Sequence, residues 1–192
     1  MGQTMMSELS VLIVAPGDEW GEASGRMLAL ADGLDARGYR ARLIHQPVER
    51  ASPPGALAAC ASVILHALGA ERTHVIHTAS LQATYAAALA SFAFTLRHPC
   101  APEPAIVTSL TEDECLTYAR RRLPLPGDYV IVSSERARRA IADGGWSRRK
   151  GGRAHVIVAG RDQSTLATLR VYSLAWGRRQ RDTRQALVAF EA

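Results

Sequence analysis

Short apolar segments recur along this chain at intervals of about 25–30 residues, and segments with helical periodicity lie between most of them. Apolar runs of this length are typical of strands buried on both faces. Their alternation with helices indicates parallel strands joined by crossover helices. We therefore expect an α/β fold with a Rossmann-like, doubly wound parallel sheet of about six strands. The expected strands are 9–15, 39–45, 73–78, 104–110, 128–134 and 154–160.

The intervening segments carry apolar residues at helical spacing. In the first of them the apolar residues are three and four positions apart, and Gly38 follows the last turn as a C-cap would. Two alanine-rich segments are apolar nearly all round, which is typical of crossover helices packed on a sheet. The last helical pattern breaks at Gly177, where we expect the helix to end. The expected helices are 22–37, 56–68, 81–96, one from Ser133 or Ser134 to Gly144, and one from Asp162 to Trp176.

The composition is that of an ordinary globular protein. Of the 192 residues, 47% are apolar and 21% are charged, which indicates neither disorder nor a fibrous repeat. No apolar run reaches the roughly 18 residues that a membrane span needs. The three cysteines lie far apart, without a C-x-x-C pair, which fits a reducing compartment. We expect a cytoplasmic protein with one domain at 1–162 and a C-terminal helix and basic tail at 163–192.

Charge is distributed unevenly between the two parts of the chain. Residues 1–117 hold 7 arginines and 12 acidic residues, whereas 118–192 hold 16 basic and 6 acidic residues. Basic clusters at 148–153 and 178–184 could attract an anionic membrane surface, which would place the protein at the inner face of the membrane. Charge runs are more often solvated faces, and we regard nucleic acid as an unlikely partner.

The turn after the first expected strand has the order strand, glycine turn, helix that many folds use to bind phosphate. Gly17, Gly21 and Gly25 are four residues apart, which does not match G-x-G-x-x-G, and the chain has no P-loop motif. Glu22 adds a negative charge that would repel a phosphate. The sequence therefore predicts the shape of a phosphate loop with chemistry that opposes that role.

Six stretches follow one another in a characteristic order. They are Gly21 to Gly25, Arg37-Gly38-Tyr39, THVIHTAS at 73–80, PAIVTSLT at 104–111, GDYVIVSSERARRAI at 127–141 and HVIVAGRD at 155–162. In order and spacing, the chain resembles the N-terminal domain of retaining, sugar-nucleotide-dependent glycosyltransferases of the GT-B fold. The resemblance covers about residues 9–162 and implies the GT-B N-terminal type of sheet.

The chain departs from this family at three positions. Glu22 replaces a glycine of the first loop, Ala79 replaces the second histidine of an H-x-H pair and leaves His77, and Leu110 replaces a histidine beside the sugar site. In the family, a second Rossmann-like domain supplies most contacts to the donor nucleotide. The roughly 30 residues after Asp162 are too few to build that domain.

The resemblance implies a glycosyltransferase-like half-domain that binds the acceptor and is inactive alone. Whether it is an enzyme is left open. If it is, it would be a hexosyltransferase that uses a nucleotide sugar as donor substrate and no other cofactor, with a donor-domain chain or a second copy as partner. The alternative is a non-catalytic module on the same fold that binds a protein, an anion or a membrane.

Candidate ligand contacts lie at the ends of the expected strands and in the glycine loop, where ligands of open α/β sheets bind. No catalytic residue is assigned, and no metal is expected. The candidate residues are Gly17, Gly21, Glu22, His77, Ser80, Thr111, Glu112, Asp113, Ser134 and Gly160.

Two of these candidates have structural alternatives. Thr111 and Glu114 form the T-x-x-E pattern of a capping box, which would explain the acidic residues without a ligand. His77 could equally be a packing residue. His74 and His77, three positions apart on one expected strand, should point to opposite faces, which makes a shared metal site improbable.

Overall fold

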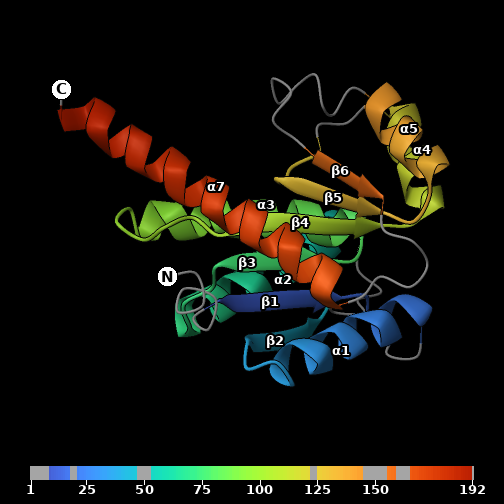
Figure 1. The fold of residues 1–192 in the computed structure, drawn as a ribbon, viewed down its shortest axis with the longest axis horizontal. Helices are drawn as coiled ribbons and strands as arrows, with labels where there is room; N and C mark the ends of the chain where they lie inside the picture. Colours follow the sequence, from blue (N-terminus) through green and yellow to red (C-terminus); the bar gives the residue numbers. More distant parts are fainter. Residues whose placement is uncertain are drawn as a thin grey trace.

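The structure is a computed structural model that describes residues 9–17, 21–46, 53–121, 125–144, 155–158 and 165–191. Strands and helices alternate along the chain (Figure 1). The strands are β1 (Ser10–Ala15), β2 (Arg40–His45), β3 (Val75–Thr78), β4 (Ala105–Leu110), β5 (Tyr129–Val132) and β6 (His155–Val158). The helices are α1 (Glu22–Asp35), α2 (Pro53–Ala70), α3 (Leu81–Arg97), α4 (Glu112–Arg121), α5 (Glu135–Asp143) and α7 (Thr165–Glu191).

The strands form one sheet in the order β2-β1-β3-β4-β5-β6, and every neighbouring pair is parallel. In the sheet, β2 lies on one side of β1, and β3 and the later strands follow one another on the other side of β1. The strand order therefore reverses between β1 and β3, the kind of position where open α/β sheets bind ligands at the carboxyl edge. The expected α/β class, with a parallel, Rossmann-like sheet and flanking helices, is confirmed.

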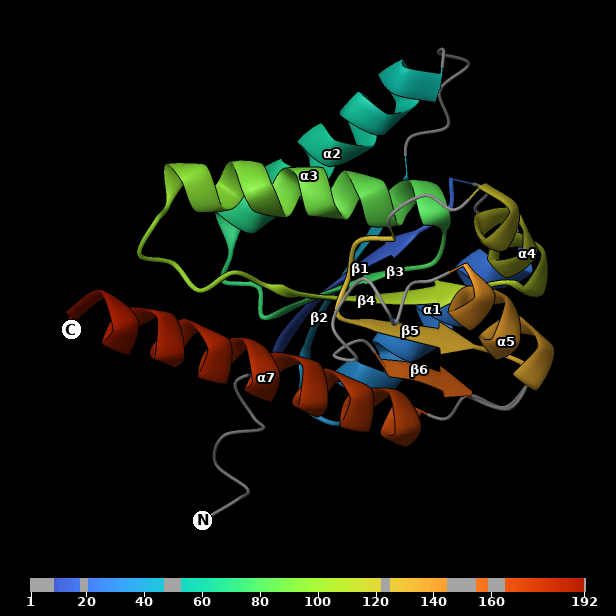
Figure 2. The ribbon, with the colours of Figure 1, turned by 90° about the horizontal axis from the view of Figure 1, so that it is seen from above.

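Helices cover both faces of this sheet. Val11 and Ile13 point to the face covered by α1 and α7, and Leu12 and Val14 point to the face covered by α2 and α3, as the two-residue period of a strand requires. A third cluster joins α4 and α5 to the latter face at β4 and β5. Figure 2 shows α2 and α3 on one side of the sheet and α7 on the other.

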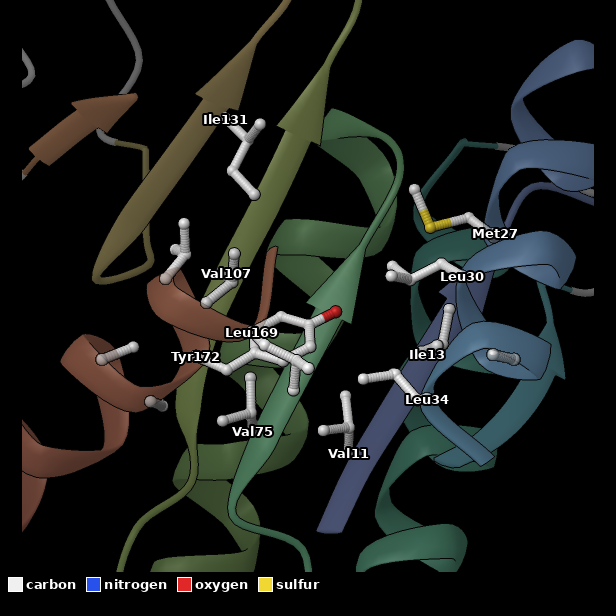
Figure 3. Close-up of a cluster of buried hydrophobic side chains, with 14 of the residues drawn as sticks. Val11, Ile13, Met27, Leu30, Leu34, Val75, Val107, Ile131, Leu169 and Tyr172 are labelled. Atoms are coloured by element: carbon white, nitrogen blue, oxygen red, sulfur yellow. The ribbon is translucent and has the colours of Figure 1, made fainter. Parts of the chain in front are cut away.

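Helix α7 crosses the sheet on the α1 face and contributes to its core. Leu169 and Tyr172 lie among side chains of β3 and β4, with Val75 and Val107 nearby (Figure 3). The helix runs from the carboxyl edge of the sheet to the amino edge and continues beyond it (Figures 1 and 2). Residues 159–164 lie outside the described part, so the expected domain boundary at 162 stays a prediction.

The expected end of the last helix at Gly177 is wrong, because α7 continues through this residue to Glu191. A glycine inside a helix costs about 1 kcal/mol relative to alanine. Contacts on both sides offset this cost: Ala175 is buried in the core, and Arg179 forms ion pairs with Glu103 and Asp128. Gly38 has a φ of 79°, as expected for the glycine that follows a helix.

Candidate functional site

A cleft of about 710 Å³ opens at the carboxyl edge of β4 and β5. Its walls are the first turns of α1, the starts of α4 and α7, and the ends of the two strands. Ligand sites usually have volumes of about 300–1,000 Å³. The described lining residues are Glu22, Ala23, Arg26, Met27, Ala29, Leu30, Ala79, Ser109, Leu110, Thr111, Glu112, Ile131, Val132, Ser133, Ser134, Thr165 and Thr168.

Hydroxyl groups dominate the polar part of this lining. Six of the described lining residues are serine or threonine: Ser109, Thr111, Ser133, Ser134, Thr165 and Thr168. Their charged neighbours are Glu22, Glu112 and Arg26. Arg26 lies 3.8 Å from Glu22 in an exposed ion pair. The described wall is therefore rich in hydroxyls and carries more negative than positive charge, which disfavours a phosphate and suits a neutral polar ligand.

Glu112 and Ser134 connect two sides of the cleft. The Ser134 hydroxyl accepts a hydrogen bond from the Ala137 amide at 3.1 Å and so caps α5, as the sequence predicts. It also donates to the Glu112 carboxylate at 2.8 Å. The other oxygen of Glu112 lies 3.0 Å from Arg136. These contacts hold the starts of α4 and α5 together at the rim of the cleft.

The capping-box interpretation of the acidic cluster is confirmed. Glu114 accepts hydrogen bonds from the Thr111 amide at 3.1 Å and from the Thr111 hydroxyl at 3.0 Å. Its second oxygen accepts from the Leu81 amide at 3.0 Å, which links α4 to the first turn of α3. Thr111 lines the cleft at this cap. Asp113 is exposed and does not belong to the described lining, so the cleft does not include it.

His77 lies directly behind the cleft and is completely buried. Its Nε2 is 2.8 Å from the Ser109 hydroxyl, which lines the cleft, and its Nδ1 contacts the Tyr172 hydroxyl of α7. Val107 is the register partner of His77, and Ser109 lies two residues after Val107 on the same strand. The side chains of His77 and Ser109 therefore both point to the α7 face. The three side chains form a hydrogen-bonded chain that runs from the core to the cleft.

Burial determines the charge states of His77 and Tyr172. It lowers the pKa of His77 to about 3 and raises that of Tyr172 well above its ordinary value of 10. The imidazole is therefore neutral at physiological pH, as is the phenol. A base with such a low pKa removes a proton from serine poorly, so His77 fixes the orientation of the Ser109 hydroxyl rather than activating it.

The glycine loop contributes less than the sequence predicts. Gly21 is the N-cap of α1 but offers no side-chain cap, and neither it nor Gly17 belongs to the described cleft lining. Glu22, the next residue, does line the cleft. Gly160 lies outside the described residues, so its predicted role stays a prediction.

The remaining histidine and serine predictions have structural explanations. Ser80 caps α3 by accepting from the Ala83 amide at 3.1 Å, and it is not part of the described cleft lining.

The expectation that His74 and His77 face opposite sides is wrong, since both contact α7, through Trp176 and Tyr172. His74 precedes the start of β3, and the alternation of a strand does not extend to it.

Sequence reasoning missed Ser109, Arg26 and the threonines of α7. Ser109 and the preceding Thr108 interrupt the apolar sequence of β4 just before its end, and this polar pair was the available signal. The α7 threonines reach the cleft only because that helix crosses the sheet, which no local pattern indicates. Among the described residues, no group of histidine, cysteine and acidic side chains is arranged to hold a metal ion.

Within the described helices, no segment combines the length and the apolar character of a membrane span. No family model matches the chain, and no curated protein matches it in sequence. Its function must therefore be inferred from the cleft and its surroundings.

Proposed function

We propose that the cleft binds a neutral, polyhydroxylated ligand, and that the chain is the acceptor-binding half of a glycosyltransferase-like system of the GT-B N-terminal type. The hydroxyl-rich wall carries this proposal. Serine and threonine both donate and accept hydrogen bonds, so they suit the alternating hydroxyls of a sugar. Glu112 adds an acceptor of the kind that binds sugar hydroxyls.

The charge of the cleft argues that the nucleotide donor binds elsewhere. The diphosphate of a nucleotide sugar would face Glu22 and Glu112, and the two nearby arginines, Arg26 and Arg136, are already paired with these carboxylates. Sugar transfer by this chain thus requires a donor-binding surface from another protein chain or from a second copy. In this proposal the isolated protein binds acceptor but does not transfer sugar, and no catalytic residue is assigned to it.

Thermal unfolding of the purified chain with a panel of neutral sugars and nucleotide sugars tests the proposal. We expect at least one neutral mono- or oligosaccharide at millimolar concentration to raise the melting temperature, since a ligand that binds the folded state stabilises it. Nucleotide sugars should have no larger effect than their free sugars. Ser109→Ala should abolish the shift, whereas Ser62→Ala, an exposed serine on α2, should retain it.

Two results would overturn this function. One is turnover of a nucleotide sugar by the isolated chain, because it would show that the donor site is present. The other is stabilisation by nucleotides but by no neutral sugar, which would mean that the cleft selects phosphate despite its charge. The alternative of a non-catalytic interaction module is favoured by one separate feature, the exposed apolar side chains of α3.

A basic membrane-binding surface has weaker support. Of the arginines expected to form it, Arg179 is engaged with Glu103 at 2.6 Å and with Asp128 at 3.2 Å. Arg181 is exposed, and 145–154 lie outside the described residues. Peripheral attachment to an anionic membrane therefore stays a secondary proposal, which sedimentation with anionic vesicles at low and high salt would test.

A further inference from the structure

The layer formed by α2 and α3 is almost free of charge. Its 35 residues include one charged side chain, Arg97, whereas 21% of the whole chain is charged. A helix that covers a sheet normally carries charged residues on its outer side. This layer faces away from α1 and α7 and from the cleft they border (Figure 2).

Large apolar side chains form a stripe along the outer side of α3. Leu89, Phe92 and Leu96 are 49%, 62% and 68% exposed, and the half-buried Tyr85 continues the stripe toward the start of the helix. The intervals from Tyr85 to Leu96 are four, three and four residues. This spacing is that of the seam of a coiled coil, in which the same positions of two helices meet. The alanines that face the sheet lie on the opposite side of the helix.

We infer that this stripe is an interface between two copies of the chain, in which α3 of one copy packs against α3 of the other across a twofold axis. A stripe with seam spacing is complementary to itself, as a twofold interface requires. Each chain carries a net charge of +5, but this face contributes a single arginine. Two copies can therefore meet here without bringing many like charges together.

The dimensions of the layer fit such an interface. The α2–α3 layer is about 25 Å long and, with two helices that are each about 10 Å wide, about 20 Å across, so it offers roughly 500 Å² per copy. Two such faces bury about 1,000 Å², the lower limit for a specific interface. A groove beside the end of the stripe, lined by Ser62, Leu65, His66, Gly69 and Ala70 of α2 and by Arg97 of α3, provides a recess for a side chain of the second copy.

The mass of the full chain in solution tests this inference. We expect sedimentation at micromolar concentrations to give twice the 20.7 kDa of one chain, and Phe92→Glu to reduce it to one chain. Leu28→Glu is the matched control: Leu28 is 52% exposed on α1, on the other face of the sheet, so the dimer should persist. Both positions are exposed, so thermal unfolding should show that each variant folds.

A cross-link provides an independent measurement. With Cys100→Ser in both proteins, oxidation should join Phe92→Cys chains into covalent dimers and leave Leu28→Cys chains single. A wild-type chain that remains single at 100 μM, or a dimer that Leu28→Glu dissociates and Phe92→Glu does not, would overturn the inference. So would wild-type binding to neutral phosphatidylcholine vesicles that Phe92→Glu abolishes, since the stripe would then face lipid. None of these outcomes depends on sugar binding in the cleft.

Discussion

Position 77 shows how a polar side chain can be completely buried without a charge. The imidazole has a hydroxyl partner at each nitrogen, Ser109 and Tyr172, so neither nitrogen lacks a hydrogen bond. Buried polar groups that lose a partner cost about 1–3 kcal/mol, whereas satisfied ones stabilise modestly. The chain of three residues therefore holds α7, β3 and β4 in register beside the cleft.

Removal of the Tyr172 hydroxyl should destabilise the protein, because His77 then loses one of its two hydrogen-bond partners. Tyr172→Phe leaves the ring in the core but takes the partner from Nδ1 of His77, and we expect the free energy of unfolding to fall by about 1–3 kcal/mol. Urea denaturation measures the change. Tyr39→Phe, a half-buried tyrosine packed against the same core, is the control and should change stability little. Equal losses in both variants would mean that the contact with His77 is unimportant.

His77 should also make stability depend on pH. Its pKa is about 3 in the folded protein, against an ordinary value of 6.5, so between these values the unfolded chain binds the extra proton. The contribution of neutral His77 to the free energy of unfolding is therefore fully present above pH 6.5. It falls as the pH decreases toward 3, by up to about 1.4 kcal/mol per pH unit. In His77→Gln this contribution is absent. Urea denaturation at pH 7.5, 6.0 and 4.5 should show a smaller decline for the variant; parallel declines would contradict the account.

At the scale of elements, α7 is the component that completes both the core and the cleft. Its first turns supply Thr165 and Thr168 to the cleft, and Tyr172 supports His77. Farther along, Arg179 is anchored to residues that precede β4 and β5, at the amino edge of the sheet. The helix is therefore fixed at both edges of the sheet it crosses.

Loss of the second anchor should destabilise the fold. Arg179→Met keeps the aliphatic stem but leaves Asp128, which is 11% exposed, without its cation. We expect a loss of about 1–3 kcal/mol in the free energy of unfolding, between the values for surface and buried pairs. Arg139→Met removes a pair that is 74% exposed on the arginine side and should cost less than about 1 kcal/mol. Equal effects would show that α7 is not anchored there.

The elements differ in how far the sequence could predict them. Apolar runs located β1, β3, β4 and β5 within about two residues, because strands buried on both faces are largely apolar. Gly38 also marked the end of α1 correctly. Gly177 led to a wrong prediction of the end of the last helix. The low helix propensity of glycine was outweighed by contacts of α7 with the sheet and with Glu103, which are distant in sequence.

The site was predictable only in part, for the same reason. Thr111, Glu112 and Ser134 follow strands directly, and parallel strands bring such residues to one edge. Gly21 and Ser80 are caps rather than described cleft residues, because capping and ligand binding favour the same residue types at strand ends. The role of His77 required knowledge of the long-range partner Tyr172.

At the scale of the whole molecule, the two faces of the sheet serve different purposes in our account. The carboxyl edge and the α1–α7 face hold the polar cleft, and the α2–α3 layer presents the apolar stripe of Leu89, Phe92 and Leu96. Dimerisation through the stripe would leave the cleft of each copy open. A donor-binding partner could then approach the cleft edge of either copy.

The most direct test of the central claim is an NMR titration of the isotope-labelled chain with neutral sugars and, separately, with nucleotide sugars. We predict that a neutral sugar shifts the amide signals of the cleft residues, with the largest changes at Ser109, Thr111 and Ser134. The stripe on α3 should stay unchanged. If only nucleotide sugars shift the cleft signals, or if no sugar shifts them, the assignment of this cleft to a neutral acceptor is contradicted.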